Sequence, residues 1–449
     1  MINSSDKAYR KYDLVVCGGG MTGVACAVSA ARQGLKTVII EKQGCLGGVG
    51  TSGQVNHILG GGYHDDKTQY HQVIGGIFEE LSKKMISLDS AIDPSLINPS
   101  KHRHGWLGGL ASGLIFDNEM MKIVLDDMCV KAGVHIWFFT NIIGVGHDEN
   151  EITKIAVHNK SGVFEIEGKY FADTTGDADI AFMSGCPVIH GREEDGLMAP
   201  ASLEMVIEKV DGNKLEEYII KQNSPRFRSL INDLRAKGVW DFPYDIFICV
   251  QLVYEDVYMI NTIRQVGVDG TNGDSVSKAM IAGRKESLKL FRIIKEYFPG
   301  FENSRIRSIA PNIGIRETRR IAGEYCLSVS DLIEGKEFDD TIAYSCYGWD
   351  LPDPKRPSAQ PMHGVKKNKL TPIPFICMLP KKIRNLIVAG RSISVEREVL
   401  GPIRVMAPCI AMGQASGTAA AIAFYEGIGF SDINNNILIA KLRQDGCIV

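Results

Sequence analysis

Apolar residues near the start of the chain form short continuous runs on either side of a longer, Ala-rich stretch. The run over 14–17 predicts a buried strand, the Ala-rich stretch to about Gln33 predicts a helix, and β-branched residues over 37–40 predict a second strand. Strands that alternate with helices in this way are typical of a doubly wound α/β fold. The later elements predicted for this region are helices over 75–88 and 118–131, a strand over 134–139 and a β-meander over 141–171.

The pattern changes after about Cys186, where longer helices separate irregular apolar segments. The elements predicted here are strands over 201–210 and 246–259, helices over 213–237 and 274–297 (the latter capped by Asp274-Ser275), and a loop or lid over 335–372. The first pattern then returns as a buried strand over 385–390 and a small-residue helix over 408–425. We therefore expect a discontinuous Rossmann-like lobe, residues 1–190 and 379–449, with an α+β lobe inserted over 191–378.

Glycines separate the first predicted strand from the first predicted helix in the pattern Gly18-x-Gly20-x-x-Gly23. The first glycine permits a tight turn, the second lets backbone N–H groups approach a pyrophosphate, and the third allows the helix to pack closely on the sheet. The helix N-terminus adds unpaired N–H groups and the positive end of its dipole. The second strand ends at Glu41, about 20 residues after the glycines, where a carboxylate can accept from ribose hydroxyls and disfavours a 2′-phosphate. The unit therefore predicts a bound dinucleotide.

The residues after Glu41 distinguish between two dinucleotides. The segment 43–48 ends in the pair Gly47-Gly48, and Thr51-Ser-Gly53 follows before any long helix resumes. An NAD dehydrogenase usually continues directly into another β-α unit at this point. The Gly-Gly pair suits a chain laid along a longer, extended cofactor, and the segment resembles the N-terminus of glutathione-reductase-type FAD proteins. We therefore expect FAD, with NAD as the alternative.

Composition narrows the class of protein further. With 449 residues, 45% of them hydrophobic, the chain can bury two or more cores. A net charge of −3 without a basic face argues against nucleic acid, and no apolar run is long enough to predict a membrane span. The eleven cysteines lie mostly in apolar runs and form no CxxC motif, which favours reduced thiols in a cytoplasmic enzyme. The oligomeric state stays open, a homo-oligomer included.

Segments spread over nearly the whole chain resemble one flavoprotein group. They are the N-terminal unit, TTGDADIA (174–181), the stretch 266–302, GIRETRRIAGEY (314–325), and the stretch 385–421 with NLIVAGRSIS at its start. In this order they are similar to the FAD-dependent oxidoreductases of the FAD_oxidored type. The resemblance implies an FAD-binding lobe, an inserted substrate lobe and oxidoreductase activity.

The resemblance also implies which residues hold the cofactor. Asp177 is expected near the phosphates or the ribityl chain. The ribityl chain and the pyrimidine edge of the flavin are expected at Gly390-Arg391 and at a Gly413-Gln414 turn. The residues expected to hold the ADP half are Gly18, Gly20, Gly23, Glu41, Lys42, Gly47 and Gly48.

Three residues are candidates for contact with the substrate. His57 follows the segment expected beside the flavin ring, where it can serve as an acid or base. Arg316 and Arg404 can each orient a substrate carboxylate or the N1–O2 edge of the flavin, or form a structural ion pair instead. The family often has histidines at the positions of Arg397 and Pro352, so a proton-transfer role of those histidines does not carry over to this chain.

Other reactive side chains are expected to be structural. Cys45 lacks a second cysteine about five residues on, because Gly50 occupies that place, so a dithiol mechanism is not expected. Glu317 and Arg320 are spaced to pair on the surface of a helix. The scattered histidines lack the grouping of a metal site, and we expect no metal.

The most specific hypothesis is hydride transfer between a small organic substrate and noncovalent FAD, with an unidentified electron acceptor or donor. One alternative is a subunit that holds FAD for electron transfer but has no substrate pocket of its own. The other is an NAD-dependent dehydrogenase built on the same β-α-β unit. No motif in the chain identifies the substrate or the direction of the reaction.

Overall fold

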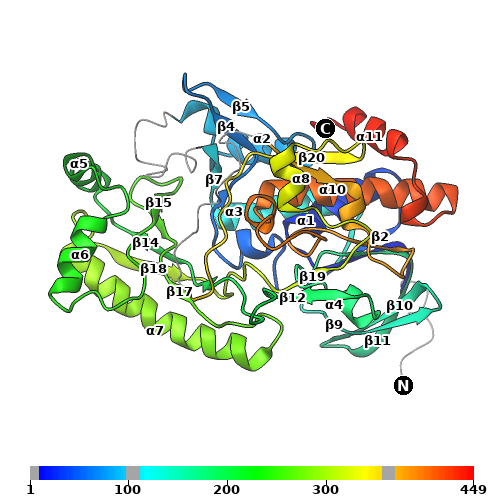
Figure 1. Cartoon of the computed structure of the whole chain (residues 1–449), viewed down its shortest axis with the longest axis horizontal. Helices are drawn as coiled ribbons and strands as arrows, with labels where there is room; N and C mark the ends of the chain where they lie inside the picture. Colours follow the sequence, from blue (N-terminus) through cyan, green and yellow to red (C-terminus); the bar gives the residue numbers. More distant parts are fainter. Residues whose placement is uncertain (1–9, 98–111, 356–369) are drawn as a thin grey trace.

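A mixed sheet of seven strands is the framework of the part of the chain that the structure describes, residues 10–97, 112–355 and 370–449 (Figure 1). In this computed structural model the strand order is β8–β2–β1–β11–β10–β9, and β22 also pairs with β11. Strands β8, β2, β1, β11 and β22 are parallel, while β9 and β10 form the predicted meander with β11. The predicted α/β class is confirmed. The strands are β1 (Lys11–Cys17), β2 (Thr37–Ile40), β8 (His135–Trp137), β9 (Asn141–Asp148), β10 (Glu151–Asn159), β11 (Gly162–Asp173) and β22 (Leu386–Val388).

Helices and smaller sheets complete the molecule (Figure 1). The α-helices are α1 (Met21–Arg32), α2 (Ile77–Ser87), α3 (Asn118–Ala132), α4 (Asp179–Met183), α5 (Gly212–Gln222), α6 (Arg228–Ala236), α7 (Gly273–Tyr297), α8 (Val329–Glu334), α9 (Leu400–Ile403), α10 (Met406–Glu426) and α11 (Asn435–Gln444). An antiparallel sheet of order β15–β16–β14–β18 contains β14 (Met205–Glu208), β15 (Cys249–Gln251), β16 (Tyr258–Ile260) and β18 (Arg305–Ile309). The remaining strands are β3 (His57–Ile58), β4 (Gly62–His64), β5 (Tyr70–Gln72), β6 (Ala91–Ile92), β7 (Leu114–Phe116), β12 (Val188–His190), β13 (Ala201–Ser202), β17 (Arg264–Gln265), β19 (Arg319–Ile321), β20 (Thr341–Ser345) and β21 (Thr371–Pro374).

Strand β1 lies inside the parallel part of the sheet and is buried on both faces. Leu14 and Val16 belong to one hydrophobic cluster, whereas Val15 and Cys17 belong to another. Because successive side chains point to opposite faces of a strand, a parallel strand that is covered on both sides needs a continuous apolar run. The uninterrupted apolar run over 14–17 in β1 meets that requirement.

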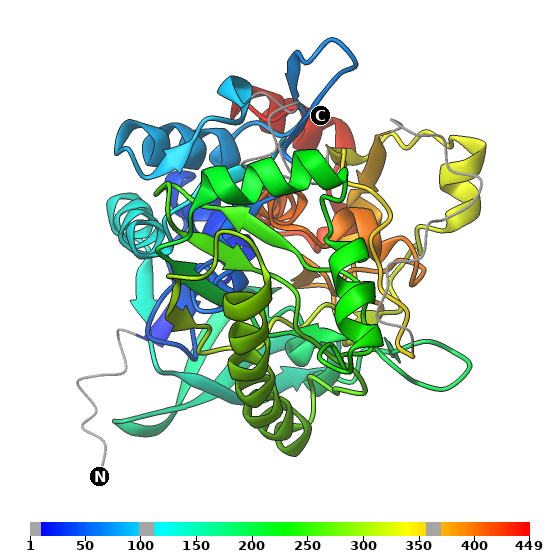
Figure 2. The ribbon, with the colours of Figure 1, turned by 90° about the vertical axis from the view of Figure 1, so that its left-hand side faces the viewer.

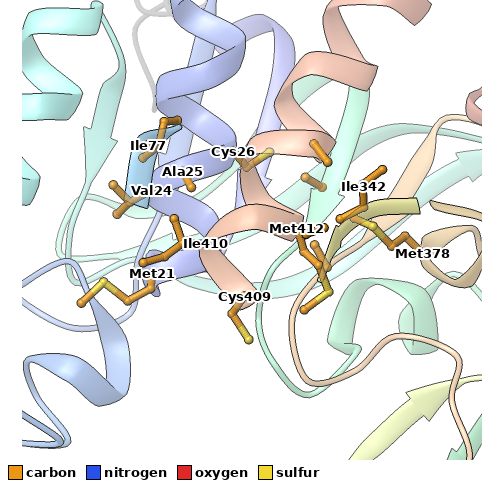
Figure 3. Packing of buried hydrophobic residues seen from close by; sticks show 14 of the residues in the cluster. Met21, Val24, Ala25, Cys26, Ile77, Ile342, Met378, Cys409, Ile410 and Met412 are labelled. Carbon is orange, nitrogen blue, oxygen red and sulfur yellow. The ribbon is translucent and has the colours of Figure 1, made fainter. Parts of the chain in front are cut away.

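Helices α1 and α10 lie side by side over the first cluster (Figure 3). A Cβ added to Gly413 would come within 2.1 Å of the Thr22 carbonyl oxygen, and one added to Gly417 within 2.3 Å of the Cys26 carbonyl oxygen. The small residues of α10 therefore let two helix backbones approach closely. None of the helices in the described ranges is long and apolar enough to cross a bilayer.

A further cluster of buried residues, separate from the two that cover β1, lies between the β15–β16–β14–β18 sheet and helices α5, α6 and α7. Figure 2 faces this part of the molecule and shows the three helices in the foreground. Many members of the cluster are aromatic: Phe227, Trp240, Tyr244, Phe247, Tyr258, Phe298 and Phe301. This region has a core of its own, as an inserted α+β lobe requires.

The single helix predicted over 213–237 is wrong, because the structure divides it into α5 and α6. Asn223 and Phe227 have left-handed φ values of 45° and 58°, and Pro225 lies between them. A proline removes a backbone donor and disfavours helical geometry in the residue before it, so the helix ends and begins again. The predicted cap of α7 also shifts: the Asn272 side chain, not that of Asp274, accepts from a backbone N–H, that of Ser275 at 3.0 Å.

The segment 335–372, expected as a loop or lid, contains strand β20, which pairs with β21. Part of the segment, residues 356–369, lies outside the described residues. The strands expected over 201–210 and 246–259 are each interrupted, since β13 and β14 occupy the first range and β15 and β16 the second. Periodicity located these strands but overestimated their lengths.

The packing bears on where one lobe ends and the other begins. Ile342, Phe375 and Met378 fall in the range expected for the inserted lobe, yet they pack in the same cluster as Met412 of α10 (Figure 3). The two-lobe division stays a proposal. We propose that the second lobe is smaller than 191–378 and ends before β19, because the later residues share the core of the first lobe.

Candidate active site

The turn after β1 has the geometry that its glycines predict. Gly18 has a φ of +106°, and a Cβ there would lie 2.6 Å from the Thr174 carbonyl oxygen. A Cβ on Gly23 would come within 1.9 Å of the Gly18 carbonyl oxygen, so this glycine allows the start of α1 to approach the turn. The Thr174 hydroxyl donates to that same carbonyl at 2.7 Å and fixes the turn against the end of β11.

Gly20 differs from its neighbours because nothing lies within 4 Å of the position of its missing Cβ. Its φ of −65° is open to any residue, and it is the N-cap of α1 without a side-chain cap. The first N–H groups of α1 therefore face an open space that a side chain at this position would enter. Such a cradle at a helix N-terminus suits a pyrophosphate.

The second glycine pair lies against the first. The Gly47 N–H donates to the Gly19 carbonyl oxygen at 2.8 Å, and Gly20 and Gly47 form a parallel bridge. A Cβ on Gly48, where φ is +54°, would lie 3.1 Å from the Gly20 Cα. The pair predicted from the sequence to follow an extended cofactor thus adjoins the pyrophosphate cradle.

Glu41 comes directly after β2 and faces the glycine turn. Its carboxylate accepts from the Gly19 N–H and from the Gln43 N–H, each at 2.7 Å. Burial raises the pKa of this carboxyl above its usual value, although those two donors oppose the shift. The acid predicted to bind a ribose therefore lies beside the cradle, while neighbouring Lys42 is exposed and its predicted contact with the ADP half stays a prediction.

Asp177 and Arg391 lie beyond the carboxyl ends of β11 and β22. We expect an extended FAD to run from Glu41 past Gly20 to this corner, and we call this expected path the groove. The Arg391 guanidinium lies 2.5 Å from the Asp177 carboxylate, which also accepts from the Thr318 hydroxyl at 2.7 Å. Gly390, which precedes Arg391, has a φ of +96°, and a Cβ there would lie 3.1 Å from the Thr22 Oγ1 in α1. The structure therefore brings the predicted ribityl residues to the same end of the sheet as the start of α1.

Gly413 and Gln414 are placed differently from the prediction. Both lie inside helix α10, not in a turn, so that part of the prediction is wrong. Gly413 faces α1, and the Gln414 side chain accepts from the Ile77 N–H at 2.7 Å, at the start of α2. The small-residue helix predicted over 408–425 already contains both positions, and the structure confirms this helix with its start at Met406.

These features fit FAD. The open cradle at Gly20 suits the pyrophosphate, Glu41 is placed for the adenosine ribose, and the Gly390–Arg391 corner follows a parallel strand of the same sheet. The expected path of FAD crosses the carboxyl ends of β1, β11 and β22, where ligands bind in open α/β sheets. The chain thus has places for both halves of an extended dinucleotide.

Arg316 and Arg404 belong to a group of charged side chains that we call the arginine cluster: Glu204, Arg264, Arg316, Asp350 and Arg404. Arg404 Nη2 donates to the Asp350 carbonyl oxygen at 2.6 Å and lies 3.5 Å from its carboxylate. Arg316 Nη1 donates to the Pro200 carbonyl oxygen at 2.5 Å. Because Arg316 and Arg404 both interact electrostatically with Asp350, the two candidate arginines lie in the same cluster.

Burial, together with repulsion from Arg264 and Arg404, lowers the pKa of Arg316 to about 10. Burial opposes ionisation of Asp350, but Arg404, Arg316 and Arg264 hold its pKa below the usual value. Burial raises the pKa of Glu204 to about 8, although the positive charges of Arg316 and Arg264 oppose this shift. At neutral pH the arginines and Asp350 are thus ionised, and most Glu204 side chains are protonated.

The cluster adjoins the flavin end of the groove through two backbone links. Arg391 donates to the carbonyl oxygen of Ile315, the residue before Arg316. Cys409, at the start of α10, donates from Sγ to the Arg404 carbonyl oxygen at 3.4 Å. Arg316 and Arg404 are therefore anchored beside the groove from two different segments.

His57 lies in β3 and is buried. A Cβ on Gly113 would come within 2.2 Å of its Nε2, so backbone approaches the ring closely. The neighbouring Asn56 side chain is also buried, and neither of its polar atoms has a hydrogen-bond partner among the described residues. Asn56 was not predicted as a site residue. The contact of His57 with substrate stays a prediction.

Glu317 and Arg320 do pair, at 3.0 Å, but in a buried site rather than on the surface of a helix. Arg320 lies in strand β19, and Arg397 binds the same carboxylate at 2.8 Å. The Ala199 N–H donates to it as well, at 2.8 Å. One buried carboxylate thus joins three segments, which gives Arg320 and Arg397 a structural role.

Cys45 lies 3.7 Å from the Thr51 hydroxyl, and the eleven cysteines are all free thiols. Across residues 10–97, 112–355 and 370–449, no three His, Cys, Asp or Glu side chains gather in a way that could hold a metal ion.

Glu204, Arg264 and Asp350 were not predicted as site residues. Glu204 and Arg264 each stand alone as the charged residue in an apolar stretch, 201–207 and 257–266. Because lone charges are rarely buried without a partner, this was the available signal. Asp350 lies in a Pro- and Lys-rich segment, where an acidic residue is not unusual and does not indicate a buried site.

The chain belongs to the FAD dependent oxidoreductase family, whose model matches residues 13–445. It is therefore an oxidoreductase with FAD as its cofactor, and the alternative cofactor NAD is set aside. This agreement covers nearly the whole chain.

Curated relatives match only parts of the chain. Dihydrolipoyl dehydrogenase of Trypanosoma brucei brucei is 52% identical over 40 residues, 9% of this chain and 8% of that protein. Digeranylgeranylglycerophospholipid reductase of Thermoplasma volcanium is 26% identical over 164 residues, 35% of this chain and 37% of that protein. The matched region thus spans less than two-fifths of either relative.

Among solved structures, a geranylgeranyl bacteriochlorophyll reductase-like protein from Thermoplasma acidophilum has a TM-score of 0.46 at 14% identity, over 97% of this chain and 83% of that one. The p-nitrophenol 4-monooxygenase of Pseudomonas putida has a TM-score of 0.45 at 11% identity, over 97% of this chain and 81% of that one.

Proposed function

We propose that the protein transfers a hydride between a carbon of a small organic substrate and noncovalently bound FAD. The observation that carries this proposal is the position of the arginine cluster. Arg391 donates to the carbonyl oxygen of Ile315, which precedes Arg316, and Cys409 of α10 donates to that of Arg404. When bound, FAD supplies the hydride acceptor or donor. The residues of the chain hold the substrate and the flavin in position for this transfer.

Each candidate residue then has a defined task. Arg316 and Arg404 bind and orient the substrate, since a guanidinium presents fixed donors in a plane. Asp177 holds Arg391 in place, and the positively charged Arg391 stabilises negative charge that develops on the flavin. His57, which lies in β3, is the proposed acid or base.

The rival hypothesis is a subunit that holds FAD and passes electrons to a partner. It needs the same groove but no substrate-binding cluster. The buried charges of the arginine cluster favour the enzyme, because a charged group without a ligand is costly to bury in an electron-transfer subunit. The free cysteines support the proposal that the protein works in the reducing cytoplasm.

The test begins with the visible spectrum of the purified protein and release of its cofactor by heat. A yellow protein that releases one FAD per chain is expected. Under anaerobic conditions a panel of small organic acids, alcohols and unsaturated compounds is then added to the oxidised and to the reduced protein. Bleaching or recovery of the flavin absorbance by one compound supports the proposal. A flavin that changes only when a second protein is added supports the electron-transfer subunit.

A further inference from the structure

The arginine cluster carries more positive than negative charge. It contains three guanidinium groups, and of its two carboxyl groups only that of Asp350 is ionised at neutral pH, since burial raises the pKa of Glu204 to about 8. An excess of one charge in a buried site is costly unless an opposite charge enters it. The composition of the cluster therefore suits an anion.

The cluster is also accessible from outside. The side chain of Asp350 is 38% exposed and that of Arg404 is 12% exposed, although protein surrounds both. Arg316 and Tyr347 are likewise only partly buried, while burial strongly perturbs the pKa of each. The side chains of Arg404 and Asp350 are thus in part open to solvent, and a small molecule can reach the cluster from that side.

Two polar atoms in the cluster have no hydrogen-bond partner within the described part of the chain. They are Glu204 Oε2, on a side chain that is almost fully buried, and Arg404 Nε. Buried polar atoms normally have a partner, and one that lacks it points to a missing ligand. A protonated carboxyl and a guanidinium N–H are both donors, so the complementary ligand presents acceptor oxygens.

From these observations we infer that the substrate carries a carboxylate group, which binds between Arg316 and Arg404 at the mouth of the arginine cluster. This inference rests on the proposed function and names the substrate class for the same site. The planar guanidinium matches a carboxylate through two parallel N–H donors. Asp350 already shows that a carboxylate is accommodated there, since its side chain lies 3.5 Å from Arg404.

The experiment uses the FAD-loaded protein and two readouts, the visible spectrum of the bound flavin and the unfolding midpoint. Small mono- and dicarboxylic acids are titrated in parallel with their amides, which have the same shape without the charge, and with inorganic phosphate. Arg316→Gln and Arg404→Gln are compared with wild type. Arg305→Gln is the matched control, because Arg305 lies on β18 of the same lobe, is 63% exposed and pairs with Glu208.

We expect at least one acid to shift the flavin spectrum and raise the midpoint, and its amide to do neither. Each cluster variant should bind that acid at least about tenfold more weakly, the range for loss of a charge-assisted hydrogen bond, while the control binds it as wild type does. Should a Gln variant not fold, Arg316→Lys and Arg404→Lys keep the charge and lose the planar fork, and weaker binding is expected again.

Four results would overturn the inference. The first three are binding of amides as tightly as acids, unchanged acid binding in both cluster variants, and binding of phosphate in place of every carboxylate. A yellow protein that no acid perturbs also overturns it, and leaves the proposed redox function standing. A colourless protein that acids still stabilise contradicts the proposed function while supporting an anion site.

Discussion

Arg391 and Asp177 form an ion pair of 2.5 Å between the ends of two neighbouring parallel strands, β22 and β11. The two residues are far apart in sequence, and the sheet register brings them together: Asp173 pairs with Val388. Arg391 also donates to the Gly176 carbonyl oxygen at 2.5 Å. This pair fixes the corner where we expect the ribityl chain of FAD.

Replacing Arg391 by Gln is expected to weaken FAD binding by about ten- to a hundredfold, as loss of a charge-assisted hydrogen bond costs about 1.5–3 kcal/mol. The dissociation constant can be measured by quenching of flavin fluorescence. Arg384→Gln is the matched control, since Arg384 precedes β22 and is 43% exposed. Equal FAD affinity of both variants and wild type would contradict the placement of the ribityl chain.

Gly20→Ala gives a direct test of the pyrophosphate cradle. Nothing within 4 Å opposes a Cβ at Gly20, and its φ of −65° suits alanine, so the apoprotein should fold with unchanged stability. FAD should bind at least about tenfold more weakly, because the methyl group occupies the space next to the helix N-terminus.

The control is Gly273→Ala at the start of α7, where nothing lies within 4 Å either. It should keep full FAD affinity. If Gly20→Ala also binds FAD as wild type does, the pyrophosphate lies elsewhere.

The β-α-β unit could be predicted because each of its features is local. The apolar run of β1, the glycines at fixed spacing and the acid after β2 all lie within about forty residues, and each has one dominant physical reason. Gly47 and Gly48 belong to the same local stretch of sequence, and their contact with FAD stays a prediction. Resemblance, not periodicity, connected Asp177 with Arg391.

Other parts of the site depend on packing between distant segments. The resemblance placed Gly413 and Gln414 in a turn, whereas the small-residue pattern predicted a helix over 408–425. The structure follows the pattern, because the small residues pack against α1. Glu204, Arg264 and Asp350 come from three segments that are distant in sequence, and nothing in their local sequence shows that they meet. A buried ion cluster of this kind becomes visible only once the chain is folded.

Glu317 should be essential for stability and not for FAD binding. Its carboxylate is fully buried and accepts from Arg320 at 3.0 Å and from Arg397 at 2.8 Å. Glu317→Gln leaves two guanidinium groups without their counter-charge, a loss of about 3–5 kcal/mol in the free energy of unfolding. Chemical denaturation measures it.

The matching surface change is Glu80→Gln, which breaks the exposed pair with Arg32 and should cost less than about 1 kcal/mol. A similar, small effect of both changes would contradict the structural role of Glu317.

Glu204 should make stability depend on pH. Its folded-state pKa of about 8 lies above the usual value of 4.5, so between these values the folded chain holds a proton that the unfolded chain has lost. The contribution of Glu204 is therefore fully present below the usual value and is lost as the pH rises through about 8. The slope is on the order of 1 kcal/mol per pH unit.

Glu204→Gln removes this titration. Unfolding free energies of wild type and variant, measured from pH 5 to pH 9, should converge or cross in favour of the variant as the pH rises. A constant difference over the whole range would show that Glu204 titrates normally beside Arg316 and Arg264.

The central claim is that this chain oxidises or reduces a substrate of its own with bound FAD. Anaerobic addition of small organic compounds to the purified yellow protein, followed in the visible absorbance of the flavin, tests it most directly. We predict that a compound bearing a carboxylate changes the redox state of the flavin without any second protein, and that Arg316→Gln slows this change by at least about tenfold. A flavin that responds to dithionite and to a partner protein, but to no small molecule, would contradict the claim.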